Sequence, residues 1–269
     1  MRPELFSIGP LTFYSYGLMI AIGVLAAIFV TERRAKQFGL NSEKIFGLGL
    51  SCSLAGVVGA KLLYIITELP DIIENPERLM SSLLSEGFVV YGGIILGVLF
   101  AILYCRWNKM PFIRYFDLAM PSVALAQGFG RIGCFLAGCC YGHETDAWYG
   151  MVFSESIFAP DVAVIPTQLI SSAANFVNFL ILITFAKKSK KDGRVGALYM
   201  INYSIGRFLI EFLRNDPRGN VGVLSTSQFI SLFILVLGVI IWCKAKDRVE
   251  ETVSAEDESE ATAEIENDK

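Results

Sequence analysis

Charged residues and histidine are scarce in this chain. Of its 269 residues, 18% are charged and a single one, His143, is a histidine. Soluble domains carry about a quarter charged residues, so this composition argues against a soluble globular protein. Nothing indicates nucleic-acid binding either, because the basic residues are scattered through short segments without a stripe or a known motif.

Long apolar runs dominate the chain instead. Apolar residues make up 54% of it, and the mean hydropathy is +0.52. The runs have about the length that a helix needs to cross the hydrocarbon core of a bilayer. The sequence therefore predicts an all-α integral membrane protein with about seven transmembrane helices. The predicted spans cover residues 12–30, 45–67, 89–104, 117–136, 169–185, 196–213 and 228–242.

Charges between the runs predict the orientation. The segments after the first, third, fifth and seventh runs are basic, and two of the other three are acidic or mixed. Positively charged loops stay on the cytoplasmic side, so we expect the N-terminus outside and the C-terminus in the cytoplasm. Residues 1–246 are predicted to form one membrane domain. Residues 247–269 are rich in Glu, Ser and Ala and lack aromatics, which predicts a disordered acidic cytoplasmic tail.

Arginines inside the apolar runs are the first candidates for function. Arg131 lies in a glycine- and cysteine-rich stretch, residues 128–142. A guanidinium is costly at membrane depth, so we expect Arg131 to face a cavity or a partner. We interpret this stretch as part of a site for an anionic lipid headgroup, in which the glycines allow close approach.

A second polar set follows helical spacing within residues 196–213 and just beyond. Its members recur every three or four residues and share one helix face; they are Tyr199, Tyr203, Arg207, Glu211 and Arg214. Two arginines share one glutamate, and the remaining positive charge suits a phosphate. The alternative is that Arg207 and Glu211 form an ion pair that only joins two helices.

Other polar and small residues near the run ends have two interpretations each. Lys61 and Tyr64 either line a site or, for Lys61, extend toward the membrane surface. Gly92 and Gly93 either expose backbone to a ligand or allow close helix packing, which is the interpretation we favour for Gly56 and Gly59. Tyr14 and Tyr16 either anchor the membrane interface or face the site.

Six cysteines are present, and three of them are clustered. Cys134, Cys139, Cys140 and His143 are potential soft ligands for a metal. The spacing is unlike that of zinc sites, and adjacent cysteines are not expected to reach one ion. A disulfide or redox role on the outer face is a second possibility. Packing of small side chains is the interpretation we favour.

Six short motifs together resemble the prolipoprotein diacylglyceryl transferase family over about residues 5 to 245. They are Tyr14-Ser-Tyr16-Gly-Leu-Met, Gly59-Ala-Lys-Leu-Leu-Tyr64, Tyr91-Gly-Gly-Ile-Ile-Leu-Gly97, Gly130-Arg-Ile-Gly-Cys-Phe-Leu-Ala-Gly138, Pro166-Thr-Gln-Leu169 and Gly206-Arg-Phe-Leu-Ile-Glu-Phe-Leu-Arg214. Each motif alone is weakly specific. Together they are specific, because all six occur in the order of the family on a chain with seven predicted spans and its N-terminus outside.

The resemblance implies a reaction and its participants. Members of this family move a diacylglyceryl group from phosphatidylglycerol to the thiol of the lipobox cysteine in a prolipoprotein signal peptide, without a metal or cofactor. This is the first step of bacterial lipoprotein maturation and takes place in the cell membrane. The resemblance places Arg131 and Arg207 near the headgroup, with Glu211 orienting Arg207 and Arg214 adding charge.

The complete set of expected site residues follows from the polar pattern and the resemblance. The expected catalytic residues are Arg131, Arg207, Tyr91 and Glu211. The expected substrate-binding residues are Tyr16, Lys61, Tyr64, Gly92, Gly93, Gly130, Gly133, Cys134, Gln168, Tyr203 and Arg214.

The chain also departs from the family pattern. Tyr91 stands where the family has a histidine, the commonly proposed base, and Cys134 and Cys139 replace an asparagine and a glutamate. A tyrosine titrates near 10, so Tyr91 is a poorer base but can donate a hydrogen bond to a phosphate. These departures leave two alternatives open. One is a phosphatidylglycerol-dependent transferase with another acceptor. The other is a non-catalytic lipid-binding or redox membrane protein that uses Cys134, Cys139 and Cys140.

Overall fold

The computed structural model describes residues 4–8, 11–75, 77, 87–154, 156, 159–215 and 219–247. Apart from Asp247, the predicted acidic tail lies outside the described residues. The described chain is mostly helical. Its long helices are α1 (Ser15–Gln37), α2 (Glu43–Thr67), α5 (Val90–Trp107), α6 (Phe112–Ala137), α7 (Thr167–Ala186), α8 (Arg194–Ile210) and α9 (Thr226–Lys244). Two short helices are α3 (Leu69–Glu74) and the 3₁₀ helix η1 (Glu211–Leu213).

The predicted apolar runs fall mainly on the long helices, although the last three residues of the run 196–213 belong to η1. In the described chain, α1, α2, α5, α7 and α9 are long and apolar enough to cross a membrane. Helices α6 and α8 carry the candidate polar residues Arg131 and Arg207 and fall outside that group. The chain is therefore a multi-pass membrane protein. The total of seven spans and the orientation of the termini stay predictions.

Short strands are the part of the fold that the sequence analysis did not predict. Residues 12–14, expected to begin the first span, belong instead to β2 (Leu11–Tyr14), which pairs antiparallel with β1 (Glu4–Ile8). The rings of Phe6 and Phe13 stack across this pair with centroids 4.7 Å apart, a contact that stabilises paired strands. The other pairs are β3 (Lys191–Asp192) with β6 (Lys246–Asp247), and β4 (Asn220–Val221) with β5 (Leu224–Ser225).

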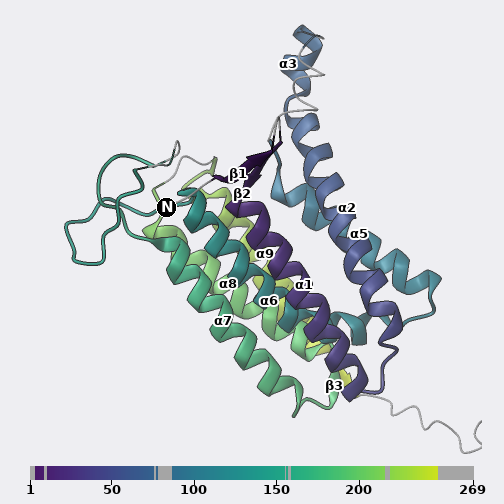
Figure 1. Cartoon of the computed structure of the whole chain (residues 1–269). Coiled ribbons are helices and arrows are strands. Elements are labelled where there is room, and N and C mark those ends of the chain that lie inside the picture. The colour runs from purple at the N-terminus through teal and green to yellow at the C-terminus, as the bar shows by residue number, and fades with distance from the viewer. Residues whose placement is uncertain are drawn as a thin grey trace, which may run out of the picture.

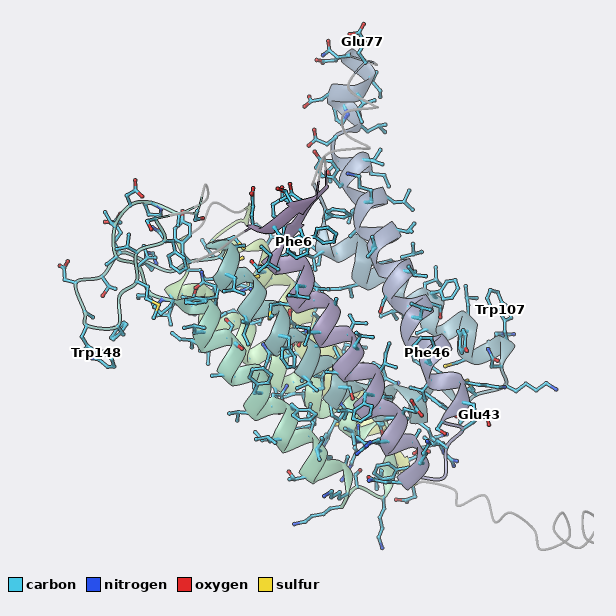
Figure 2. The ribbon with its side chains drawn as sticks, viewed as in Figure 1. Phe6, Glu43, Phe46, Glu77, Trp107 and Trp148 are labelled. Carbon is cyan, nitrogen blue, oxygen red and sulfur yellow. The ribbon has the colours of Figure 1, made fainter. Side chains whose placement is uncertain are left out.

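The long helices form a bundle with a hairpin leaning against it. Helices α1, α6, α7, α8 and α9 lie side by side, while α2 and α5 pair with each other and stand beside α1 (Figure 1). An apolar cavity of about 470 Å³ lies between the hairpin and helices α1 and α6. Figure 2 shows Phe46 and Trp107 on the hairpin, and their side chains are 55% and 68% exposed, as expected for a lipid-facing surface.

Glycines bring α2 and α5 close together. A Cβ atom added to Gly59 would lie 2.4 Å from the Gly92 carbonyl oxygen, and one added to Gly92 would lie 2.2 Å from the Gly59 oxygen. One added to Gly93 would lie 2.7 Å from the Gly56 oxygen. Small residues permit such close approach between helices in membranes. The structure therefore uses these glycines for helix packing.

Hydrogen bonds of charged side chains connect α1, α6 and α8 at the end of the bundle that carries β3. Asp117 on α6 accepts hydrogen bonds from the backbone N–H groups of Gly193 (2.7 Å) and Gly196 (2.8 Å), at the start of α8. A carboxylate there also interacts favourably with the positive end of the helix dipole. Arg34 on α1 donates to the carbonyl oxygen of Leu118 on α6. These contacts set the positions of α1, α6 and α8, and thus the place of the site residues farther along α6 and α8.

Candidate functional site

A cavity lies between α7 and α8, with Arg131 of α6 in its wall and apolar side chains over most of its lining. Its volume is about 260 Å³. The polar side chains among its lining residues are Arg131, Ser171, Asn175, Asn178, Asn202, Tyr203 and Arg207. Among the described residues, the Arg131 guanidinium forms no hydrogen bond or ion pair, so its charge is available to a ligand in this cavity. The sequence expectation that Arg131 faces a cavity agrees with this geometry.

Arg207 lies at the same cavity, near the end of α8. Its Nη1 is 2.7 Å from Oε2 of Glu211, and the two side chains are 10% and 6% exposed. Its Nη2 donates a 2.6 Å hydrogen bond to Oγ of Ser227 on α9. Glu211 belongs to η1, which continues α8, so the ion pair joins neighbouring turns and does not join two long helices. The contact between α8 and another long helix is the hydrogen bond from Arg207 to Ser227 on α9. Together these contacts hold the guanidinium of Arg207 at the cavity.

Arg214 adds a third guanidinium to the same region. It follows η1 and is 8% exposed, and it forms a β-bridge with Gly142 in the loop after α6. The charges of Arg131 and Arg214 both act on Arg207. The guanidiniums of Arg131 and Arg214 therefore lie near that of Arg207, which itself pairs with Glu211. A cluster of this kind favours phosphate over neutral ligands.

The clustered cysteines lie next to these arginines. Helix α6 ends at Ala137, and its C-cap Gly138 has a left-handed φ of 70°. The chain then turns through Cys139 and Cys140. The sulfur atoms of Cys134, Cys139 and Cys140 all lie within 4.8 Å of one another. The turn after α6 therefore directs the side chains of both adjacent cysteines toward Cys134.

The environment separates the acidities of the two thiols that follow α6. Hydrogen bonds with Cys134 and Cys139, together with the positive charges of Arg214 and Arg131, lower the pKa of the Cys140 thiol from its ordinary value. Hydrogen bonds with Cys134 and Cys140, together with burial, raise the pKa of the Cys139 thiol. Within this cluster, Cys140 is therefore the thiol that loses its proton most readily.

Two buried side chains at the start of α7 hold the cysteine turn. Thr167 Oγ1 donates a 2.7 Å hydrogen bond to the carbonyl oxygen of Cys140, and Gln168 Nε2 donates a 2.8 Å bond to that of Cys139. Both Thr167 and Gln168 are 1% exposed. Gln168, expected to bind substrate, is therefore absent from the wall of the α7–α8 cavity, and its amide nitrogen binds backbone instead.

Residues at the junction of α1 and α6 lie beside the cysteine cluster. Tyr16 interacts electrostatically with Arg131 and with the three thiols. A Cβ atom added to Gly133 would lie 3.1 Å from the Tyr16 ring, so this glycine lets α1 approach α6. A Cβ atom added to Gly130 would meet nothing within 4 Å, which leaves open space at that position.

Several expected site residues lie on the hairpin instead. The Nζ of Lys61 donates to the carbonyl oxygen of Gly87 at 3.4 Å and lies 5.0 Å from the centroid of the Tyr64 ring. Tyr91 is the second residue of α5 and is 36% exposed. The lining of the α7–α8 cavity includes none of Lys61, Tyr64, Tyr91, Gly92 and Gly93. A substrate role for them stays a prediction.

The sequence analysis also missed residues that the structure brings to the cavity. Asn202 Nδ2 on α8 donates a 2.9 Å hydrogen bond to Oδ1 of Asn178 on α7, and Asn175 lies one turn before Asn178. Amides within apolar runs are costly unless they are paired, and this is the signal that could have identified them. Ser227 could have been found only through its contact with Arg207, which no sequence pattern encodes.

Comparison with known proteins finds the same family by two routes, a family model and individual relatives. The family model described as prolipoprotein diacylglyceryl transferase matches residues 3–244. A Clostridium tetani protein named phosphatidylglycerol–prolipoprotein diacylglyceryl transferase is 48% identical over 243 residues, which cover 90% of this chain and 97% of the relative. A Clostridium perfringens protein of the same name, numbered 2, is 46% identical over 90% of this chain and 94% of its own length. A Prochlorococcus marinus protein of that name is 35% identical over 89% of each chain.

Proposed function

Because the chain belongs to the prolipoprotein diacylglyceryl transferase family, we propose that it transfers a diacylglyceryl group from phosphatidylglycerol to the lipobox cysteine thiol of a prolipoprotein. In this reaction the bond between the glyceryl carbon and the phosphate oxygen breaks, and a carbon–sulfur bond forms. Glycerol phosphate leaves with the bonding electrons, and the thiol loses its proton. The product is a thioether-linked diacylglyceryl protein.

The arginine-lined cavity between α7 and α8 carries this proposal. Negative charge builds on the phosphate as it leaves, so positive groups placed there lower the barrier. Arg131 and Arg207 both line the cavity. Arg207 is oriented by Glu211 and Ser227, whereas Arg131 forms no hydrogen bond within the described chain and is therefore the group that contacts the phosphate most directly. Arg214 adds positive charge close to Arg207.

The acceptor thiol also benefits from this field. A free cysteine thiol has a pKa near 8.5, and the attacking species is the thiolate. A positive cavity favours the thiolate, so the same arginines that hold the phosphate promote loss of the thiol proton. Tyr91 is not among the residues that line this cavity. A hydrogen bond from its hydroxyl to the phosphate stays a prediction.

The placement of charges supports an orientation with the N-terminus outside the cell membrane. Residues 187–194, from the end of α7 through β3 to the start of α8, contain four lysines and Arg194 but only one acidic residue, Asp192. The strands β1 and β2 lie at the opposite end of the bundle (Figure 1). The positive-inside tendency assigns the basic end to the cytoplasm. The site then lies toward the outer side of the bacterial cytoplasmic membrane, on seven spans.

Transfer to a defined peptide tests the proposal. The purified chain is placed in vesicles that contain phosphatidylglycerol and is given a peptide with a lipobox cysteine. We expect the peptide mass to rise by one diacylglyceryl group on the cysteine, and no rise when serine replaces that cysteine. A folded sample that yields no product would refute the proposal. Labelling of a different acceptor would favour the alternative transferase.

Arginine variants assign the chemistry to the cavity. Losing one charge-stabilising donor typically costs about 10²–10³ in kcat, so we expect a loss of that size in Arg131→Ala. Arg106→Ala is the matched control, because Arg106 is exposed at the far end of α5. Equal activity of the two variants would remove Arg131 from the mechanism.

A further inference from the structure

The proposed reaction leaves the convergence of three thiols unexplained. Cys134, Cys139 and Cys140 place their sulfur atoms within 4.8 Å of one another, on two segments of chain that meet at the end of α6. We propose that these three side chains bind a thiophilic divalent metal ion of the zinc class as thiolate ligands. Binding releases every proton that the three thiols still carry, because a metal-bound cysteine is deprotonated.

The sulfur separations are close to those that such an ion requires. Zinc–sulfur bonds are about 2.3 Å long, so two sulfurs on a tetrahedral ion lie roughly 3.8 Å apart. The present limit of 4.8 Å exceeds this by only about an ångström. Small side-chain rotations close that difference without movement of helices. Three protein ligands leave a fourth position for water or another thiol, as in open zinc sites.

The backbone holds the cysteines in this arrangement before any ion arrives. Cys140 has a φ of 65°, which is uncommon for a residue other than glycine. Such a conformation persists only where the surroundings enforce it. Here the carbonyl oxygens of Cys139 and Cys140 accept hydrogen bonds from the buried side chains of Gln168 and Thr167. Supporting contacts of this kind orient ligands in metal sites.

Neighbouring charge favours a metal–thiolate complex over a free cation. Three thiolates and one divalent ion carry a net charge of −1. The positive charges of Arg131 and Arg214 act on this cluster and compensate that excess. Cys139 and Cys140 are partly exposed, so an ion can enter from their side.

Metal titration of the whole reduced chain in detergent tests the site. Cadmium serves as the probe because its bonds to sulfur give a charge-transfer absorption in the ultraviolet, and zinc then competes for the same site. We expect one cadmium per chain and complete displacement by zinc. Removing one ligand should weaken binding by about 100-fold or more, since even loss of a supporting contact costs 10–100-fold.

Matched variants distinguish the cluster from the other cysteines. Cys52→Ser combined with Cys243→Ser removes two thiols outside the cluster and should leave cadmium binding unchanged. Cys134→Ser and Cys139→Ser should abolish the stoichiometric absorption. Thr167→Val keeps all three thiols and should weaken binding by about tenfold.

Two outcomes would overturn the proposal. One is a folded chain with six reactive thiols that binds no cadmium. The other is stoichiometric binding that survives Cys134→Ser with Cys139→Ser. Neither outcome depends on transfer activity, so the metal site and the proposed function fail separately.

Discussion

The buried ion pair between Arg207 and Glu211 allows a quantitative test of the site. Glu211→Gln keeps the shape of the side chain and removes its charge. The paired atoms are 2.7 Å apart, and the two side chains are 10% and 6% exposed, so water replaces the lost charge poorly. Breaking such a pair costs about 3–5 kcal/mol, because the remaining charge is left buried. We expect the free energy of unfolding to fall by about that amount.

A second ion pair with the same spacing provides the control. Lys36 and Glu32 are also four residues apart, at 3.3 Å, but their side chains are 64% and 39% exposed. Exposed pairs contribute about 0–1 kcal/mol, so Glu32→Gln should have little effect. The measurement is reversible denaturation of each variant in the same detergent, followed by helical signal. Equal losses in Glu211→Gln and Glu32→Gln would refute the view that burial of this pair matters.

An anion should partly restore the Glu211→Gln variant. With the carboxylate gone, Arg131, Arg207 and Arg214 are left as a cluster of positive charges, and a bound phosphate replaces the missing negative charge. A ligand at 100 times its Kd stabilises a folded protein by about 2.7 kcal/mol. We expect phosphatidylglycerol in the micelles to stabilise the variant more than the original chain. Equal stabilisation would show that the headgroup binds away from the arginines.

Three further predictions concern the supports of the site and of the helices. Thr167→Val removes the donor to the Cys140 carbonyl and should lower the unfolding free energy by about 1–3 kcal/mol, whereas Thr167→Ser should not; equal losses would contradict the role of this bond. Gly92→Ala places a Cβ 2.2 Å from the Gly59 oxygen and should cost about 1–3 kcal/mol in thermal unfolding, and an unchanged Tm would contradict close packing there. Ser225→Ala removes the N-terminal cap of α9 and should cost about 1 kcal/mol in denaturant unfolding, while Ser225→Asp should retain most of the stability.

Much of the membrane architecture could be predicted from the sequence because it depends on local composition. The predicted apolar runs lie mainly on long helices, since a backbone in lipid must satisfy its own hydrogen bonds. The first run was placed too early, because residues 12–14 pair with β1 and stacking of Phe6 on Phe13 decides that choice. Cross-strand contacts of this kind are not visible in a hydropathy pattern.

The sequence alone identified the family of the chain, and it identified the arginines on α6 and α8 as candidate site residues. Their spacing and their cost at membrane depth are properties of single segments. Only the tertiary structure decided which residues share the cavity. Tyr91 and Lys61 are absent from its lining, Asn178 lines it and pairs with Asn202, and Ser227 binds Arg207. The tertiary structure also places the sulfur atoms of the adjacent residues Cys139 and Cys140 close to that of Cys134. The physical reason is that these contacts join distant segments, and their geometry depends on how whole helices pack.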